Sequence, residues 1–220
     1  MSGVEQTFFL SSADEVARQL LGSLLVSELE GVRCAGVVVE TEAYPGPHDP
    51  ASHAAGRIGR TARNAAMFGP GGSCYLYRIY GIHLCLNVVT GDEGFPAAVL
   101  VRAAQPVEGI GVMASRRGGR PERELMRGPG NLARALGVTS GLNGHDLSRP
   151  PLYLLPGQPV TPARVARGPR VGVTRATGWP LRFWVEGSAY VSASGRTSGA
   201  GVGTPLASSG PEITHDRRRR

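Results

Sequence analysis

Two carboxylates stand two positions apart at the end of an apolar run. Glu40 and Glu42 follow three valines (37–39), and Tyr44 comes two residues later. Alternate residues of a strand point to the same face of a sheet, so both carboxylates are expected on one face. Charged groups are rarely buried unpaired, and the structural alternative is an edge strand with one carboxylate paired to an arginine. The pattern favours a general base or a metal ligand over that alternative.

A loop rich in proline and glycine follows and adds His48, Asp49 and His53. Together with Glu40 and Glu42, these side chains could form a hydrolytic metal site. Their spacing matches no fixed ligand pattern, and isolated His and Asp residues in such loops are usually solvated. We therefore expect neither a metal nor a cofactor.

Tyrosine is concentrated in the same region of the chain. Four of the six tyrosines, at positions 44, 75, 77 and 80, fall within 37 residues. Tyr75 is also typical of a half-buried strand, where tyrosine packs well. A flat aromatic ring beside a carboxylate and near arginines is suited to holding a nucleobase, and stacking contributes about 1–3 kcal/mol per base.

Short strands and helices must position these residues. A capping-box pattern predicts a helix at 12–21. Short β-branched or aromatic stretches predict strands, at 23–28, 34–44, 73–80, 84–90, 97–104, 151–155, 170–174 and 181–192. Two short helices are expected at 107–116 and 122–136, the second interrupted at 128–130. The fold class is α+β, a single mixed domain with a curved, mostly antiparallel sheet and flanking short helices. The irregular segment 45–72 is long enough to be functional.

Charge points to a phosphate-bearing partner. The 220 residues fit one domain, with a formal net charge of +7, and all 24 basic residues are arginine. Without lysine, mechanisms that need a side-chain amine are excluded. Arginine-rich basic chains favour nucleic acid. We expect a catalytic domain at 1–194 and a disordered basic tail at 195–220.

The remaining composition indicates a cytoplasmic protein. Three widely spaced cysteines, Cys34, Cys74 and Cys85, fit no disulfide framework or CxxC motif and are expected to be reduced and buried. No apolar run approaches the roughly 20 residues that span a bilayer, and the N-terminus lacks a secretory pattern. We expect a monomer without membrane contact, in the cytoplasm and associated with the nucleoid when bound to DNA.

The chain resembles the alkyladenine (3-methyladenine) DNA glycosylases of the mammalian type and their bacterial relatives. The resemblance covers most of residues 12–193 in the family's order, and ETEAY and YxxYG are its most specific pieces. It is carried by VETEAYPGPHDPASHA (39–54), ARNAAMF (62–68), YLYRIYGIHLCLNV (75–88), VLVRAAQP (99–106), GPGNLARAL (128–136) and PLRFWVEGSAYVS (180–192).

The resemblance implies a role for seven residues. Glu42 matches the general base that activates water for attack on C1′ of the damaged nucleotide, and Arg102 matches an arginine near the target phosphate and that water. Asn87 matches a residue near the purine 2-position that disfavours guanine. Tyr44, His53 and Tyr77 match the walls around the flipped base. Tyr80 matches the side chain that is inserted into the duplex.

The resemblance thus implies a monofunctional glycosylase that binds double-stranded DNA containing damaged purines, in base excision repair. Its substrates would be 3-methyladenine, 7-methylguanine, hypoxanthine and ethenoadenine. Glu40 has no catalytic counterpart, and His83 replaces an aromatic hydroxyl of mammalian members. Two alternatives remain open: a metal-dependent nuclease built on Glu40, Glu42 and Asp49, and a nucleic-acid-binding protein without catalysis.

Overall fold

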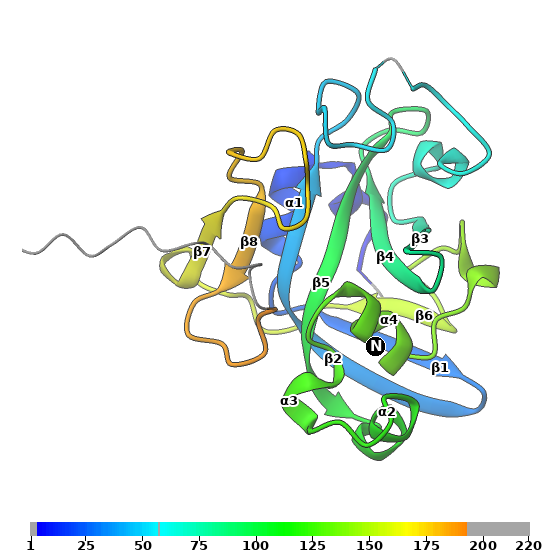
Figure 1. Ribbon diagram of the computed structural model, residues 1–220, viewed down its shortest axis with the longest axis vertical. Helices are drawn as coiled ribbons and strands as arrows, with labels where there is room; N and C mark the ends of the chain where they lie inside the picture. The colour runs from blue at the N-terminus through cyan, green and yellow to red at the C-terminus, as the bar shows by residue number, and fades with distance from the viewer. Residues whose placement is uncertain (1–3, 57, 193–220) are drawn as a thin grey trace, which may run out of the picture.

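Eight strands form one antiparallel sheet in the computed structural model, which describes residues 4–56 and 58–192 (Figure 1). The strand order is β3-β4-β5-β2-β1-β6, and β8 pairs with both β2 and β7. The strands are β1 (Leu24–Leu29), β2 (Val32–Tyr44), β3 (Cys74–Ile79), β4 (His83–Thr90), β5 (Ala97–Glu108), β6 (Leu152–Leu155), β7 (Val165–Gly168) and β8 (Arg182–Val185). The α+β class and the curved antiparallel sheet expected from the sequence are confirmed.

The long strand β2 lies inside the sheet. Residues 35–44 pair with β5 on one side, while 32–37 pair with β1 and 40–42 pair with β8 on the other. Register shifts on both sides of Glu40 mark β-bulges, which bend a strand and re-aim its side chains. The edge-strand alternative for the two carboxylates is therefore wrong, because β8 covers this part of β2.

Short helices lie against the sheet, and their ends follow local sequence signals. They are α1 (Ala13–Gln19), α2 (Ile110–Arg116), α3 (Glu122–Leu125) and α4 (Pro129–Ala135), with 3-10 turns at Gln6–Leu10, Ala65–Phe68, Ser140–Leu142 and Pro162–Arg164. Gly128 has a φ of 103°, which favours glycine, and Pro129 then begins α4. The second helical region is interrupted as expected, but at 126–128, because Pro129 and Gly130 lie inside α4.

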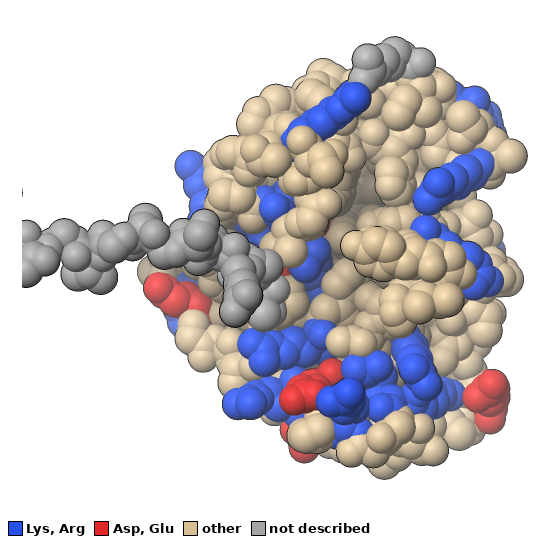
Figure 2. All heavy atoms as spheres, viewed as in Figure 1, with Lys and Arg blue, Asp and Glu red and all other residues tan. Residues whose placement is uncertain are grey.

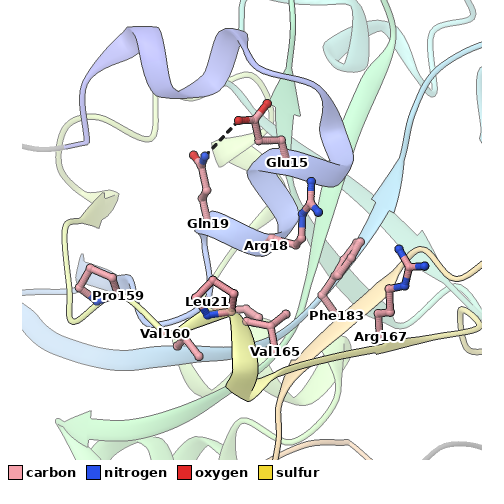
Figure 3. A pocket seen from close by; sticks show the side chains of 10 residues that line it. Glu15, Arg18, Gln19, Leu21, Pro159, Val160, Val165, Arg167 and Phe183 are labelled. Carbon is pink, nitrogen blue, oxygen red and sulfur yellow. Dashed lines mark hydrogen bonds between the residues drawn. The ribbon is translucent and has the colours of Figure 1, made fainter.

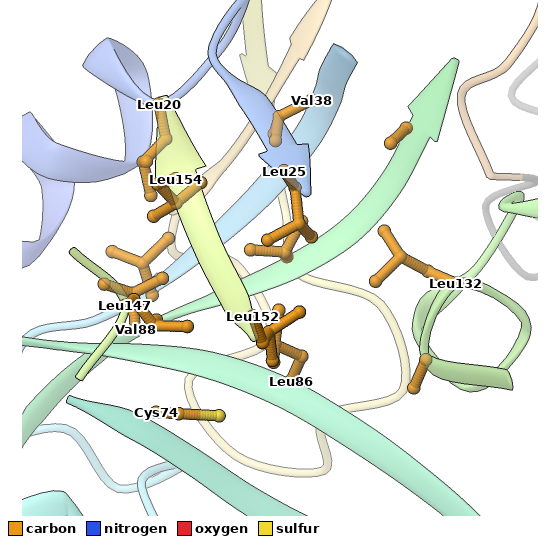
Figure 4. Packing of buried hydrophobic residues seen from close by; sticks show 14 of the residues in the cluster. Leu20, Leu25, Val38, Cys74, Leu86, Val88, Leu132, Leu147, Leu152 and Leu154 are labelled. Atoms are coloured by element: carbon orange, nitrogen blue, oxygen red, sulfur yellow. The ribbon is translucent and has the colours of Figure 1, made fainter. Parts of the chain in front are cut away.

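The main hydrophobic core is formed by side chains from almost every element (Figure 4). Its fully buried members include Leu20, Leu25, Val38, Leu86, Val88, Leu132, Leu147, Leu152 and Leu154. Burying such a side chain contributes about 1.5–3 kcal/mol relative to leaving it exposed. The three cysteines are also buried and free, as expected. This core supports the sheet from which the site residues project.

Two sequence predictions fail near the C-terminal end of the described region. Residues 170–174 form no strand, because the strand that pairs with β8 is β7, at Val165–Gly168. The strand expected at 181–192 covers only Arg182–Val185. Among the described residues, no helix is long and apolar enough to cross a membrane. The expected tail, 195–220, lies outside the described residues.

Candidate active site

One face of the sheet carries almost all the residues singled out in the sequence. Glu42 of β2 is paired in register with Leu100 of β5, Leu100 with Asn87 of β4, and Asn87 with Tyr75 of β3. A strand's side chains alternate between faces, so neighbouring valines and leucines of these strands enter the main core instead. The period of two thus gathers residues separated by 58 positions into one row across four strands.

A cavity of about 700 Å³ lies over this row. The space-filling view shows the face hollowed near its centre, with arginines gathered below the hollow (Figure 2). The lining includes Tyr44, His53, Tyr75, Tyr77, Tyr80, Asn87 and Arg102, together with the segment 171–175. Six of the seven predicted site residues therefore line one cavity. The seventh, Glu42, lies directly behind it and is bonded to three lining residues, Tyr44, Arg102 and Val171.

Glu42 is fully buried and has three polar partners, two hydrogen-bond donors and one arginine in an ion pair. Its Oε1 accepts from the backbone N–H of Val171 at 2.7 Å and lies 3.1 Å from Nη1 of Arg102. Its Oε2 accepts from the Tyr44 hydroxyl at 3.0 Å. Burial raises the pKa of the Glu42 carboxyl above its ordinary value, while Arg102, Val171 and Tyr44 all act to lower it. These donors favour the ionised form that a general base requires.

Arg102 connects Glu42 with Glu40. It occupies a bulge, since its neighbours Val101 and Ala103 pair with Thr41 and Glu40. Its Nε donates to Glu40 Oε1 at 3.0 Å while Nη1 faces Glu42. Burial lowers the pKa of Arg102, but the two carboxylates raise it more, and the net shift is upward. Arg102 therefore remains a cation between the Glu40 and Glu42 carboxylates.

Glu40 is occupied by structural partners. Besides Arg102, its Oε1 accepts from Nε of Arg182 at 2.7 Å and from the Ser192 hydroxyl at 2.9 Å. Its Oε2 accepts from the Ser192 backbone N–H at 2.6 Å. These contacts tie β8 and the chain after it to β2. Arginine pairing, the structural reading of this carboxylate, therefore fits Glu40 and leaves Glu42 as the group nearer the cavity.

Aromatic rings form the cavity walls. The His53 ring meets the Tyr77 ring edge to face, with centroids 4.5 Å apart, and its Nδ1 lies 2.8 Å from the Tyr75 hydroxyl. Burial lowers the pKa of His53, which favours the neutral imidazole. Burial also raises the pKa of Tyr75 to about 12, so its hydroxyl stays protonated. The aromatic part of the wall is thus flat and uncharged, whereas Arg102 gives the lining a positive charge.

Tyr80 projects from the tip of the β3–β4 hairpin and is 86% exposed. Tyr80 and Gly81 have φ values of 52° and 74°, and the N–H of Ile82 donates to the carbonyl of Ile79 at 3.3 Å. Two central residues with positive φ make a type I′ turn, which matches the twist of the strands. Ile82 lies at the same tip and is 72% exposed. It was not singled out in the sequence, although it directly follows the Tyr80-Gly81 turn.

Asn87 lies in the cavity wall with its amide held by backbone groups. Its Nδ2 donates to the carbonyl of Tyr75 at 3.0 Å and to that of Cys85 at 3.3 Å. The residue is only 3% exposed. Asn87 therefore lines the cavity while its amide is bonded to the backbone of β3 and of its own strand, β4.

Sequence reasoning missed the loop 169–175, whose backbone supplies a donor to Glu42. Asp49, weighed as a metal ligand, is paired with Arg170 of this loop in a fully buried ion pair. A backbone N–H has no side-chain signature, so Val171 could not be found from its residue type. Among residues 4–56 and 58–192, no group of three or more His, Cys, Asp or Glu side chains could hold a metal ion.

A separate cavity of about 610 Å³ lies between α1 and the β7–β8 pair (Figure 3). Leu21, Val160, Val165 and Phe183 give it an apolar lining, and Glu15 accepts a hydrogen bond from Gln19 at 3.3 Å. It contains none of the predicted site residues. The cavity of about 700 Å³ over the row from Glu42 to Tyr75 is therefore the candidate active site.

Comparison with known proteins identifies the family of this chain. Residues 7–189 match the methylpurine-DNA glycosylase family, and the chain belongs to that family, which makes it a DNA glycosylase. The resemblance seen in the sequence is thereby confirmed.

Several relatives are nearly half identical to the chain. A protein of Myxococcus xanthus is 48% identical over 195 residues, which is 87% of this chain and 94% of the relative. One from Rhodopseudomonas palustris (strain BisB18) is 48% identical over 86% of this chain and 90% of its own. One from Methanoculleus marisnigri is 48% identical over 84% of this chain and 96% of its own. All three are named as 3-methyladenine DNA glycosylases.

Proposed function

We propose that this protein is a monofunctional DNA glycosylase for alkylated and otherwise modified purines, acting in base excision repair. Its substrate class comprises 3-methyladenine, 7-methylguanine, hypoxanthine and ethenoadenine in double-stranded DNA. The observation that carries the proposal is the buried Glu42 carboxylate, bonded to the aromatic wall of a cavity of about 700 Å³. A single nucleobase, once turned out of the duplex, needs a pocket of this kind.

The walls suit an electron-poor ring. A cationic alkylpurine stacked on Tyr44 or Tyr77 gains cation–π attraction that a neutral base lacks. Alkylation also makes the glycosidic bond labile, so little assistance to the leaving group is required. The tyrosine walls then select the lesion, and one carboxylate is a sufficient catalyst.

In the proposed reaction, Glu42 accepts a proton from a water while the water oxygen bonds to C1′. The bond from C1′ to the purine nitrogen breaks, and its electron pair leaves with the base. This pair neutralises an alkylated ring, whereas hypoxanthine or ethenoadenine leaves as an anion and takes up a proton from solvent water. A carboxylate has about four lone-pair sites. Oε1 of Glu42 accepts one hydrogen bond and faces Arg102, while Oε2 accepts one, so Oε2 retains a lone pair that can take the proton of the water. Arg102 would stay protonated throughout and balance the negative charge of the Glu42 carboxylate.

The nuclease alternative is weakened by the partners of its carboxylates. Asp49 is paired with Arg170, and Glu40 with Arg102 and Arg182. Glu42 alone of the three is bonded to a tyrosine of the cavity wall, Tyr44. The absence of lysine further removes the usual lyase nucleophile, which supports hydrolysis without strand cleavage.

Release of free 3-methyladenine from methylated duplex DNA tests this proposal. The wild-type chain should release it with and without EDTA, and Glu42→Gln should bind lesion DNA but excise about 10²–10⁴-fold more slowly, because the amide accepts no proton. Glu40→Gln is the matched control for changing a buried carboxylate. Near-wild-type single-turnover excision by Glu42→Gln would refute the assignment of the base, and rescue by a divalent ion after EDTA would favour the nuclease.

A further inference from the structure

Two loops that contribute to the cavity wall are joined by an ion pair buried in the protein. The loop after β2 supplies Pro50, Ala51 and His53 to the lining, and the other loop supplies residues 171–175. Asp49 directly precedes the lining part of the first loop, and Arg170 directly precedes that of the second. Their side chains are fully buried and pair through both carboxylate oxygens, with Nη2 of the arginine 2.8 Å from Oδ1.

Arg170 also contacts the end of β2 in two ways. Its Nη1 donates to the carbonyl of Ala43 at 3.0 Å. Its guanidinium carbon lies 4.6 Å from the centre of the Tyr44 ring, within the range of a cation–π contact. Tyr44 is the residue whose hydroxyl donates to Oε2 of Glu42. One side of the Glu42 carboxylate therefore depends on a ring on which Arg170 rests.

The other side of the carboxylate depends on the residue after Arg170. The N–H of Val171 donates to Oε1 of Glu42 at 2.7 Å. Adjacent residues share a planar peptide, so anchoring Arg170 restricts where this N–H points. Neither Asp49 nor Arg170 is among the described residues that line the cavity. The pair therefore acts on the site through its neighbours and through the charge of Arg170, without lining the cavity itself.

We infer that the Asp49–Arg170 ion pair positions the Glu42 carboxylate by fixing the Val171 N–H and the Tyr44 ring. This inference rests on the proposed function, in which Glu42 is the base. A buried ion pair is weak support for stability, since apolar residues of similar size often serve as well. A bidentate arginine–carboxylate pair gives fixed geometry instead. Asp49 and Arg170 are thus positioning residues and have no direct part in the reaction.

The test uses the double variant Asp49→Asn/Arg170→Met, which removes both charges together and leaves no buried charge unpaired. The asparagine side chain keeps an oxygen that can accept from the Ala51 N–H, as Oδ1 of Asp49 does at 3.0 Å in the wild type. The matched control is Leu147→Ala, which lowers stability from the main core without altering either loop. If the double variant does not fold, the same two measurements are made on Arg170→Lys, which keeps the charge but loses the bidentate geometry.

Two measurements distinguish positioning from plain stability. The first is hydrogen exchange of the Val171 amide, which should be slow in the wild type and in Leu147→Ala and fast in the double variant. The second is the pH profile of single-turnover excision from one substrate. Losing a donor raises the pKa of Glu42, so the acid limb should move up by about one pH unit in the double variant only.

A double variant with slow Val171 exchange and an unshifted limb would overturn the inference, whatever its Tm. Failure of the proposed function has a different signature. In that case Glu42→Gln excises normally, while the exchange of Val171 still reports whether the ion pair fixes the loop.

Discussion

At the scale of single residues, the pKa of Glu42 is set by opposing influences. Burial raises it, and the Tyr44 hydroxyl is one of the groups that lower it. As a general base Glu42 must be ionised, so excision should increase as pH rises through its pKa. Tyr44→Phe keeps the ring but removes the donor. We expect its acid limb to move to higher pH by about one unit, measured against wild type on the same substrate.

Tyr75→Phe is the control for that experiment. It also removes a buried hydroxyl, but this one lies 2.8 Å from His53 and makes no contact with Glu42. Its acid limb should coincide with that of the wild type. Equal shifts in the two variants would show that the profile reports general damage to the cavity.

Asn87 offers a test of substrate selection. Guanine carries an exocyclic amine at the 2-position that adenine and hypoxanthine lack, and the family resemblance puts Asn87 near that position. A shorter side chain removes a steric clash. Asn87→Ser should therefore raise excision of guanine relative to hypoxanthine, measured as a ratio of single-turnover rates. An unchanged ratio in a folded variant would contradict the role.

The hydrogen bonds of Asn87 predict a second consequence. Its amide donates to the carbonyls of Tyr75 and Cys85, so Asn87→Ser should also lower the free energy of unfolding by about 1 kcal/mol. Thermal unfolding measures this loss separately. A purely structural residue would slow excision of both bases equally.

At the scale of elements, the β3–β4 hairpin holds Tyr80 in a fixed, exposed conformation. The type I′ turn joins two strands in continuous register, so the backbone that carries the ring is held at the tip of the hairpin. Filling the gap left by a flipped base offsets part of the unstacking cost. Tyr80→Ala should therefore reduce excision from duplex DNA more than from single-stranded DNA.

Ile82→Ala is the matched control, since it removes an apolar side chain from the same tip. Comparing both variants on both substrates separates the ring from general exposure of the hairpin. An equal loss on duplex and single strands for Tyr80→Ala would argue against insertion into the stack.

The elements that were predictable from the sequence are those with strong periodicity. The strands from β1 to β5 and the helix α1 were placed nearly at their observed bounds, but the order of the strands, which creates the row from Glu42 to Tyr75, was not predicted. The segment 170–174 was misjudged as a strand, because valines alternate there as they do in strands. Its backbone instead turns toward Glu42.

What the sequence could not provide is the partner of each charge. Asp49 and Arg170 are 121 positions apart, too far for any local motif to link them, and only the fold brings them together. The same holds for Glu40 and Arg182. Residue types indicated the chemistry, whereas long-range pairing decided which carboxylate is free to act.

At the scale of the whole molecule, positive charge is concentrated beside the cavity. Figure 2 shows arginines below the hollow, in the part of the face where Figure 1 shows α2, α3 and α4. Burial lowers the pKa of Arg117, and the charges of Arg134 and Arg120 lower it further. Like charges held this close favour binding of a polyanion such as the phosphate backbone of DNA.

This surface makes a quantitative prediction about salt. Each phosphate contact adds about 0.9 to the slope of log K against log salt on duplex DNA. Arg120→Gln/Arg134→Gln should therefore reduce the slope by up to about 1.8. The control Arg18→Gln/Arg167→Gln removes the same charge beside the separate cavity of Figure 3 and should change the slope less. Excision at saturating enzyme should stay near wild type in both double variants, since none of the four arginines contacts Glu40 or Glu42.

Equal slopes for the two double variants would show that net charge, rather than this surface, governs DNA binding.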